Sequence, residues 1–237
     1  MDNLIIINDA KVDEAFIVDI FNKGYIKKPK IILRLLDGYL PYNADAIILA
    51  RSLREYAKNF RVFDNYLEIN WDFGIAISKK YCLIYKAYPA YFAYLLGHEL
   101  GHANICADDI SLHVFYCLIQ EHIKTASNGE VSSWHVLPHE VKFDQFGLYI
   151  AEALFGREKI DNEIKSLLDD ESRDDSEILS LMLMLKGTTD LSNLRDELVA
   201  FAKPYRTELI ESWEKSIDVY GKESLASYFD DLNALFF

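Results

Sequence analysis

Two histidines four residues apart enclose a glutamate in the sequence HELGH, which contains His98, Glu99 and His102. The surrounding residues 90–105 are predicted to form a helix, on which residues four apart share one face with Cβ atoms about 5–6 Å apart. Two imidazoles in this arrangement can bind one zinc ion, each at about 2.0–2.1 Å. Glu99 would flank the first ligand, where it can accept a proton from a zinc-bound water. The pattern therefore predicts a zinc site with Glu99 as its general base.

Chance explains the HExxH pattern poorly. The chain has 237 residues and 6 histidines, and roughly 0.01 matches are expected at random for such a composition. The alternative is that the two histidines are packed or solvated on an ordinary helix and bind no metal.

A catalytic zinc site needs three protein ligands and a water, so the two histidines require a further ligand from elsewhere in the chain. Glu140 is the favoured candidate. Pro138 predicts the start of a second helix, which places Glu140 in its first turn and Asp144 one turn later on the same face. The Glu140 carboxylate can then meet the zinc ion, and Asp144 can accept the second ring N–H of a bound histidine. Without a metal, both are ordinary acids near a helix start, where the helix dipole favours them.

Other candidates for the third ligand fit less well. Asp108 follows His102 by six residues, but Ile105 lies where a sharp turn would need glycine. Cys106 is about 12 Å from the first histidine along the helix axis, which is too far for one ion to reach both. A histidine near the start of the second helix could also enter the site, and the two such residues are His135 and His139.

An HExxH helix followed by ExxxD on a later helix resembles the gluzincin metallopeptidases. The sequence EVKFDQFG at 140–147 is most similar to the second-helix motif of the prenyl-protein and heat-shock membrane protease clan and its soluble relatives. The similarity spans residues 88–155. In that group the glutamate is the third zinc ligand and the aspartate orients a histidine, which implies these roles for Glu140 and Asp144. A peptidase of the phage-exclusion type, which cuts a translation factor, fits the layout by analogy.

The chain departs from that clan in two ways. Its membrane members carry transmembrane helices, whereas no window here reaches the roughly 18 apolar residues needed. Many members also place a downstream histidine or arginine to stabilise the oxyanion, and no histidine follows His139. The donor could instead come from His135, His139, Tyr205 or Arg206, and the choice among them stays open.

Hydrophobic periodicity predicts the elements that must position these residues. Helices are expected over 13–22, 44–60, 89–106, 111–125 and 138–156. Short strands are expected over 4–7, 66–71 and 75–78, with a turn at 72–74. The strand 66–71 could offer an edge to an extended peptide. The acidic segment 161–177 is expected to form a solvated helix face and loop.

The predicted fold class is α+β. It is mostly helical, with a small N-terminal mixed sheet packed beside the HExxH helix in a zincin-like arrangement. Residues 1–156 are expected to form the catalytic domain, and residues 157–237 a C-terminal helical subdomain. The composition, with 51% hydrophobic and 27% charged residues, is that of a globular protein.

The net charge of −13 opposes binding to phosphate backbones and to anionic membranes, so nucleic-acid and membrane partners are not expected. The N-terminus lacks the pattern of a secretory signal. Three cysteines without CxxC spacing argue against disulfides and against a cysteine zinc site. These features predict a soluble cytoplasmic protein with free thiols.

The sequence thus predicts a soluble zinc metalloendopeptidase that hydrolyses peptide bonds in a protein or peptide substrate. One alternative is a catalytically inactive protein of the same fold that acts as a binding or regulatory module. Another is a metal-dependent hydrolase with a non-peptide substrate. The sequence leaves the substrate and the oligomeric state open.

Overall fold

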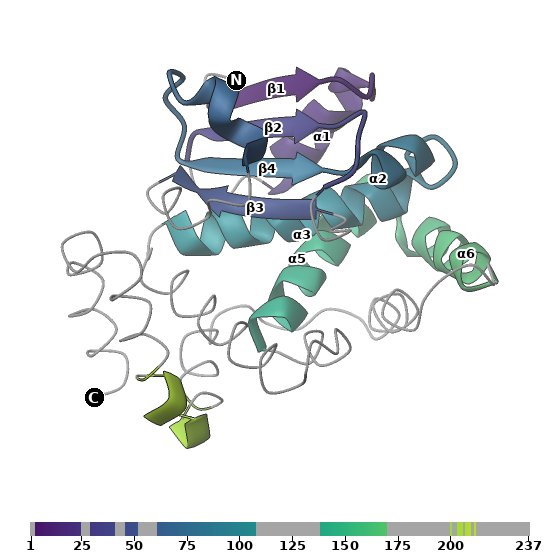
Figure 1. Cartoon of the computed structure of the whole chain (residues 1–237). Helices are drawn as coiled ribbons and strands as arrows, with labels where there is room; N and C mark the ends of the chain where they lie inside the picture. Colours follow the sequence, from purple (N-terminus) through teal and green to yellow (C-terminus); the bar gives the residue numbers. More distant parts are fainter. Residues whose placement is uncertain are drawn as a thin grey trace.

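The computed structural model describes residues 3–24, 29–40, 46–51, 61–107, 138–169, 200, 203–205, 207–209 and 211 (Figure 1). The fold is α+β and mostly helical, with a small mixed sheet at the N-terminus, which confirms the predicted fold class. Within the described residues, no helix combines the length and apolar character that crossing a membrane requires.

The elements are β1 (Leu4–Asn8), α1 (Glu14–Gly24), β2 (Ile31–Leu35), β3 (Ala46–Ala50), the 3₁₀ helix η3 (Arg61–Tyr66), β4 (Phe73–Ile77), α2 (Lys79–Ile84), α3 (Pro89–Ala107), α5 (Pro138–Phe155), α6 (Arg157–Leu168) and the 3₁₀ helix η5 (Lys203–Tyr205).

The four strands form one sheet in the order β1-β2-β4-β3. Strands β1, β2 and β4 are parallel, and β3 runs antiparallel to β4. Figure 1 shows β3 at the edge of the sheet with α3 running beside it. The helix that carries HExxH is therefore packed next to the antiparallel edge strand.

Alternation along the strands divides the sheet into two apolar faces. Ile31, Leu33 and Leu35 of β2 face the helices and are fully buried in the main core with residues of α1, α3 and α5. Ile32 faces the other side, where it packs with Phe63 and Trp71. Because both faces of the two central strands are covered, these strands consist largely of continuous apolar residues.

Helices α3 and α5 cross at glycines, so their backbones approach closely. A Cβ atom added at Gly147 of α5 would lie 2.9 Å from the backbone nitrogen of His98, and one added at Gly97 of α3 would lie 2.9 Å from the Gly147 Cα. Neither approach is compatible with a side chain. At Gly101 an added Cβ would lie 3.2 Å from the ring of Phe143. The crossing therefore depends on small residues at the point where the two helices meet.

A carboxylate from α6 caps the N-terminus of α3. Glu163 Oε2 accepts a hydrogen bond of 2.9 Å from the backbone N–H of Tyr91, which is one of the donors that a helix start leaves without an intrahelical partner. Glu163 is buried, and its other oxygen lies 3.1 Å from Lys159 Nζ. The expectation that the acidic segment is solvated is therefore wrong at this residue. Ile160, Ile164 and Leu167 of α6 also belong to the main core. The predicted boundary between a catalytic domain and a C-terminal subdomain after residue 156 stays a prediction.

The predicted helix over 44–60 is wrong where the structure describes it, because residues 46–50 form β3. The run AIILA is apolar at every position, so it carries no period that separates a buried strand from a buried helix. Residues 52–60 lie outside the described part of the chain. Strand β2 was not predicted, and its sequence IILRL is a similar short apolar run.

The predicted strand over 66–71 is also wrong, although its pattern of apolar residues is real. Trp71 is fully buried, and Leu67 and Ile69 pack against the same cluster. The backbone carbonyls of Leu67 and Ile69 accept hydrogen bonds of 2.8 Å from the guanidinium of Arg51 instead of from a neighbouring strand. The side chain of Arg51 thus supplies the hydrogen bonds that a neighbouring strand would give to these carbonyls. The segment is a turn, although its apolar side chains are buried as they would be in a strand.

The turn expected at 72–74 is wrong because β4 begins at Phe73. Gly74 lies within the strand, where a Cβ would approach the Phe63 ring to 2.8 Å. The predicted strands over 4–7 and 75–78 and the helices over 13–22, 89–106 and 138–156 are confirmed, with ends shifted by a few residues. The helix predicted over 111–125 lies outside the described residues.

The glycine crossing gives a first prediction. Gly147→Ala should lower the free energy of unfolding by at least about 2 kcal/mol, because the new methyl group meets backbone atoms of α3 that can move only with the whole helix. Urea unfolding of the metal-free protein measures this change. The matched control is Gly38→Ala, since an added Cβ there has nothing within 4 Å, and it should change stability by less than about 0.5 kcal/mol. Equal effects of the two substitutions would contradict the steric account.

Candidate metal centre

Helix α3 directs the two histidines to one point. The ring centroids of His98 and His102 are 4.9 Å apart, as expected for residues one turn apart. Their Nε2 atoms are 3.0 Å apart. Both rings therefore present the same nitrogen to a common position.

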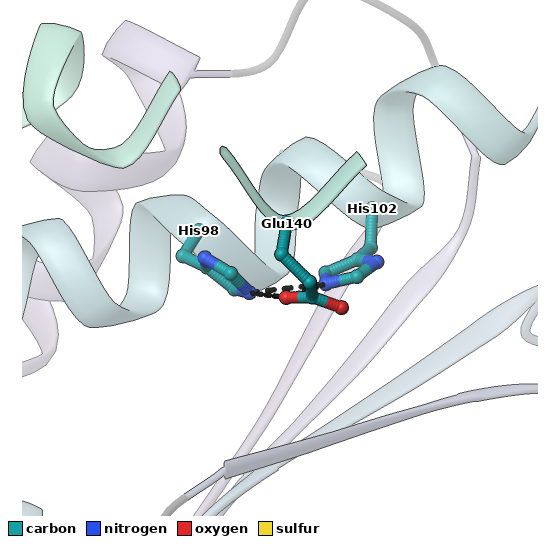
Figure 2. Close-up of side chains that lie close together, drawn as sticks. All are labelled: His98, His102 and Glu140. Atoms are coloured by element: carbon teal, nitrogen blue, oxygen red, sulfur yellow. Dashed lines mark hydrogen bonds and ion pairs between the residues drawn. The ribbon is translucent and has the colours of Figure 1, made fainter. Parts of the chain in front are cut away.

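Glu140, in the first turn of α5, supplies a third ligand atom at that position. Its Oε2 lies 3.3 Å from His98 Nε2 and 3.9 Å from His102 Nε2. Figure 2 shows the Glu140 carboxylate between the two imidazoles, with dashed contacts to both. In the described part of the chain, these three residues form the group whose ligand atoms all lie within 4.8 Å of one another. The predicted proximity of Glu140 to both rings is thus observed.

The spacing of these atoms can be tested against a zinc ion. Ligand atoms held tetrahedrally at about 2.0–2.1 Å from one ion are about 3.3 Å from each other. The three separations are 3.0, 3.3 and 3.9 Å, which are distributed around that value. Two imidazole nitrogens and one carboxylate oxygen are also donors that zinc accepts. The residues present therefore fit a divalent ion such as zinc.

Asp144 binds the opposite nitrogen of the first histidine. Its Oδ1 lies 2.9 Å from His98 Nδ1. An ionised carboxylate can only accept, so Nδ1 carries the proton. In the neutral ring this leaves the Nε2 lone pair directed at Glu140 and His102. The predicted contact between Asp144 and a histidine of the motif is thus observed, while its role toward a bound metal stays a prediction.

Two positioning contacts were not predicted from the sequence. The Tyr94 hydroxyl donates a hydrogen bond to Asp144 Oδ1, and Tyr94 lies one turn before His98 on α3. Phe143 packs on His102, with ring centroids 3.8 Å apart and planes inclined by 42°. Helical spacing to the histidine was a signal for Tyr94. For Phe143 the only signal was its place beside Asp144.

The site is largely removed from water. The exposed fraction of the side chain is 14% for His98, 12% for Glu140 and 5% for His102. Burial alone would lower the pKa of His98, but the hydrogen bonds and charges of Asp144 and Glu140 outweigh it and raise the pKa well above its ordinary value. In the metal-free protein, the carboxylates of Asp144 and Glu140 thus favour the protonated form of His98.

Glu99 is buried beside the ligands, as its place in the HExxH sequence requires. Burial raises the pKa of its carboxyl group from 4.5 to about 7. The positive charge of His98 acts in the opposite direction, and the negative charges of Glu140 and Asp144 raise it further. A carboxyl group whose pKa lies near neutrality can both accept and return a proton.

The remaining candidates are placed less fully. His139 is in the first turn of α5, but its side chain is outside the described part of the structure, as is that of Cys106 in α3. His135, Asp108 and Arg206 lie outside the described residues. Tyr205 is in η5 with 41% of its surface exposed, and an oxyanion-stabilising role for it or for the two histidines stays a prediction.

Comparison with known proteins gives no family for this chain. No family model matches it, and no curated protein or solved structure matches it significantly.

The raised pKa of Glu99 predicts a pH-dependent gain in stability for Glu99→Gln in the metal-free protein. A carboxyl group with a folded-state pKa of about 7 stabilises the fold only while protonated, and this contribution is lost as pH rises from 4.5 through 7. The neutral amide avoids that loss. Urea unfolding in the presence of a chelator should show a gain of about 3 kcal/mol at pH 8 and about 1 kcal/mol or less at pH 5.

The matched control is Glu208→Gln at an exposed position, which should change stability little at either pH. A Glu99→Gln gain of equal size at pH 5 and pH 8 would show that the carboxyl group does not titrate in this window.

Proposed function

We propose that this protein is a zinc-dependent metallopeptidase that hydrolyses peptide bonds with a metal-activated water. The observation that supports this most is the convergence of His98 Nε2, His102 Nε2 and Glu140 Oε2, with Asp144 bound to the far side of the His98 ring. Two helices from separate parts of the chain supply these groups. A chance pair of histidines would need neither the third ligand nor the orienting carboxylate.

The donor set favours zinc in a catalytic setting. Catalytic zinc sites commonly use three protein ligands, among them the His₂Glu combination, and leave a position for water or substrate. Structural zinc sites are usually closed by four ligands and are rich in cysteine. Within the described residues, the group contains three ligands and no thiolate.

His98, His102 and Glu140 would hold the zinc ion, which would supply an acidified water and a positive charge to polarise the peptide carbonyl. Glu99 is proposed as the general base that accepts the proton of the attacking water and then delivers it to the leaving amine. The pKa of Glu99 is about 7 in the metal-free protein, and a bound divalent cation would lower it toward the ionised form that a base needs. Asp144 keeps the His98 tautomer whose Nε2 is available as a ligand.

The proposed substrate is a protein or peptide in an extended conformation. Strand β3, rather than the segment 66–71, provides the sheet edge beside α3. Main-chain hydrogen bonds to an edge strand are a common mode of peptide binding. A segment added along β3 would therefore run next to the helix that carries His98 and His102 (Figure 1).

Zinc binding and peptide cleavage are expected to respond differently to two substitutions. Glu140→Gln should weaken zinc binding by at least about 100-fold, because it replaces an anionic ligand. Glu99→Gln should retain zinc and abolish the cleavage of unfolded casein. Zinc affinity is measured by competition with a chromophoric chelator, and cleavage by the release of peptides. Glu152→Gln, the same change on α5 at the partner of Arg157, is the control and should leave both within about twofold.

Purified wild-type protein that binds no zinc, or zinc affinity unchanged in Glu140→Gln, would reject the ligand set. Tight zinc binding with no turnover of any unfolded protein would reject the peptidase and favour the inactive binding module. Turnover of a non-peptide substrate alone would favour a different metal-dependent hydrolase.

A further inference from the structure

We infer that Tyr94 is a positioning residue of the metal centre, which holds Asp144 so that Asp144 can orient His98. This inference rests on the proposed metal site, and it assigns a function to a residue outside both sequence motifs. The Tyr94 hydroxyl donates to Asp144, which is not one of the three ligands. It acts through a chain of two hydrogen bonds that ends on a ligand.

The chain of contacts converges on one oxygen atom. Asp144 Oδ1 accepts a hydrogen bond from the Tyr94 hydroxyl and another from His98 Nδ1 at 2.9 Å. The other oxygen of Asp144, Oδ2, is buried and has no hydrogen-bond partner in the part of the chain that the structure describes. The two described hydrogen bonds therefore determine which oxygen faces the imidazole. Loss of the Tyr94 hydroxyl would leave that choice to the His98 contact alone.

The position of the Tyr94 hydroxyl is itself fixed by packing. The ring is 2% exposed and stacks on Tyr91, with centroids 6.0 Å apart and planes inclined by 17°. Gly147 also lies against Tyr94, since an added Cβ there would approach Tyr94 Cδ2 to 3.1 Å. A ring enclosed in this way presents its hydroxyl in one direction, as a preorganised supporting shell requires.

The contact also links the two helices at the level where their ligands meet. Tyr94 and His98 are one turn apart on α3, and both donate to Asp144 of α5. A hydrogen bond from a hydroxyl to a buried carboxylate is of the stronger, charge-assisted kind. Tyr94 therefore sets the position of Asp144 relative to the helix that carries two of the ligands.

The test is Tyr94→Phe, which removes the hydroxyl and keeps the stacked ring. Zinc affinity of the full-length protein, measured by chelator competition, should fall about 3- to 10-fold, which is less than the roughly 10- to 100-fold cost of removing a direct partner of a ligand, because Tyr94 acts one contact further out. The absorption spectrum of the cobalt-substituted protein should change as the His98 ring shifts. Tyr88→Phe is the control: its hydroxyl is 3.4 Å from Ser166 Oγ, and its removal should leave affinity and spectrum unchanged.

A double-mutant cycle separates positioning through Asp144 from general packing. In an Asp144→Ala background, Tyr94→Phe should change zinc affinity by less than about twofold, because the link is already broken. An equal loss in both backgrounds would show that Tyr94 acts through helix packing and would overturn the inference. So would an affinity within twofold of wild type for the single variant.

These readouts require no turnover, so the two proposals can fail separately. If the protein binds zinc with the expected dependence on Tyr94 but cleaves nothing, this inference stands and the proposed peptidase activity is rejected. If it cleaves peptides but its zinc affinity does not depend on Tyr94, the proposed function stands and this inference is rejected. Wild-type protein that binds no zinc overturns both.

Discussion

The close approach of α3 and α5 is the constraint on which the site depends. The histidines lie on one helix and the carboxylates on the other, so ligand geometry is set by the distance between two backbones. That distance is short because Gly97 and Gly147 face each other without side chains. Gly101, within the HExxH sequence itself, leaves room for Phe143, whose ring then packs on His102. Glycine thus has a steric role inside the motif as well as beside it.

The same packing buries several ionisable side chains next to one another. Glu99, His102 and Asp144 are each at most 8% exposed, and the side chain of Glu140 is 12% exposed. Burying carboxylates is costly unless each is paired or hydrogen bonded. In the metal-free protein a protonated His98 meets part of this need, which explains why its pKa is raised. A divalent cation between Glu140 and the two imidazoles would balance the same negative charge and would compete with that proton.

The sequence predicted the residues of the site better than the sheet that supports it. His98, His102, Glu140 and Asp144 were found because each depends on spacing within one helix and on a proline that begins the second. Tyr94 and Phe143 were missed because their contacts exist only once the helices cross. Strands β2 and β3 were missed or misassigned because their short, largely apolar runs, IILRL and AIILA, show no period that separates a strand from a helix. The turn at 66–71 buries alternate residues as a strand does, but its backbone carbonyls accept hydrogen bonds from Arg51. No local sequence pattern reveals that contact.

The four-residue spacing of Glu140 and Asp144 has a geometric reason. Four residues of helix advance about 6 Å, which lets two carboxylates on the same face of α5 bracket a single imidazole, one at each nitrogen. This is the arrangement observed around His98, with Glu140 at Nε2 and Asp144 at Nδ1. A shift of α5 by one turn would put Asp144 where the ligand belongs and remove the orienting group. Gly147 prevents such a shift, because another residue of α5 at that point would drive its Cβ into the backbone of Tyr94 and His98. Gly147 therefore fixes the register of α5 on α3 in which Glu140 faces Nε2 of His98 and Asp144 faces Nδ1.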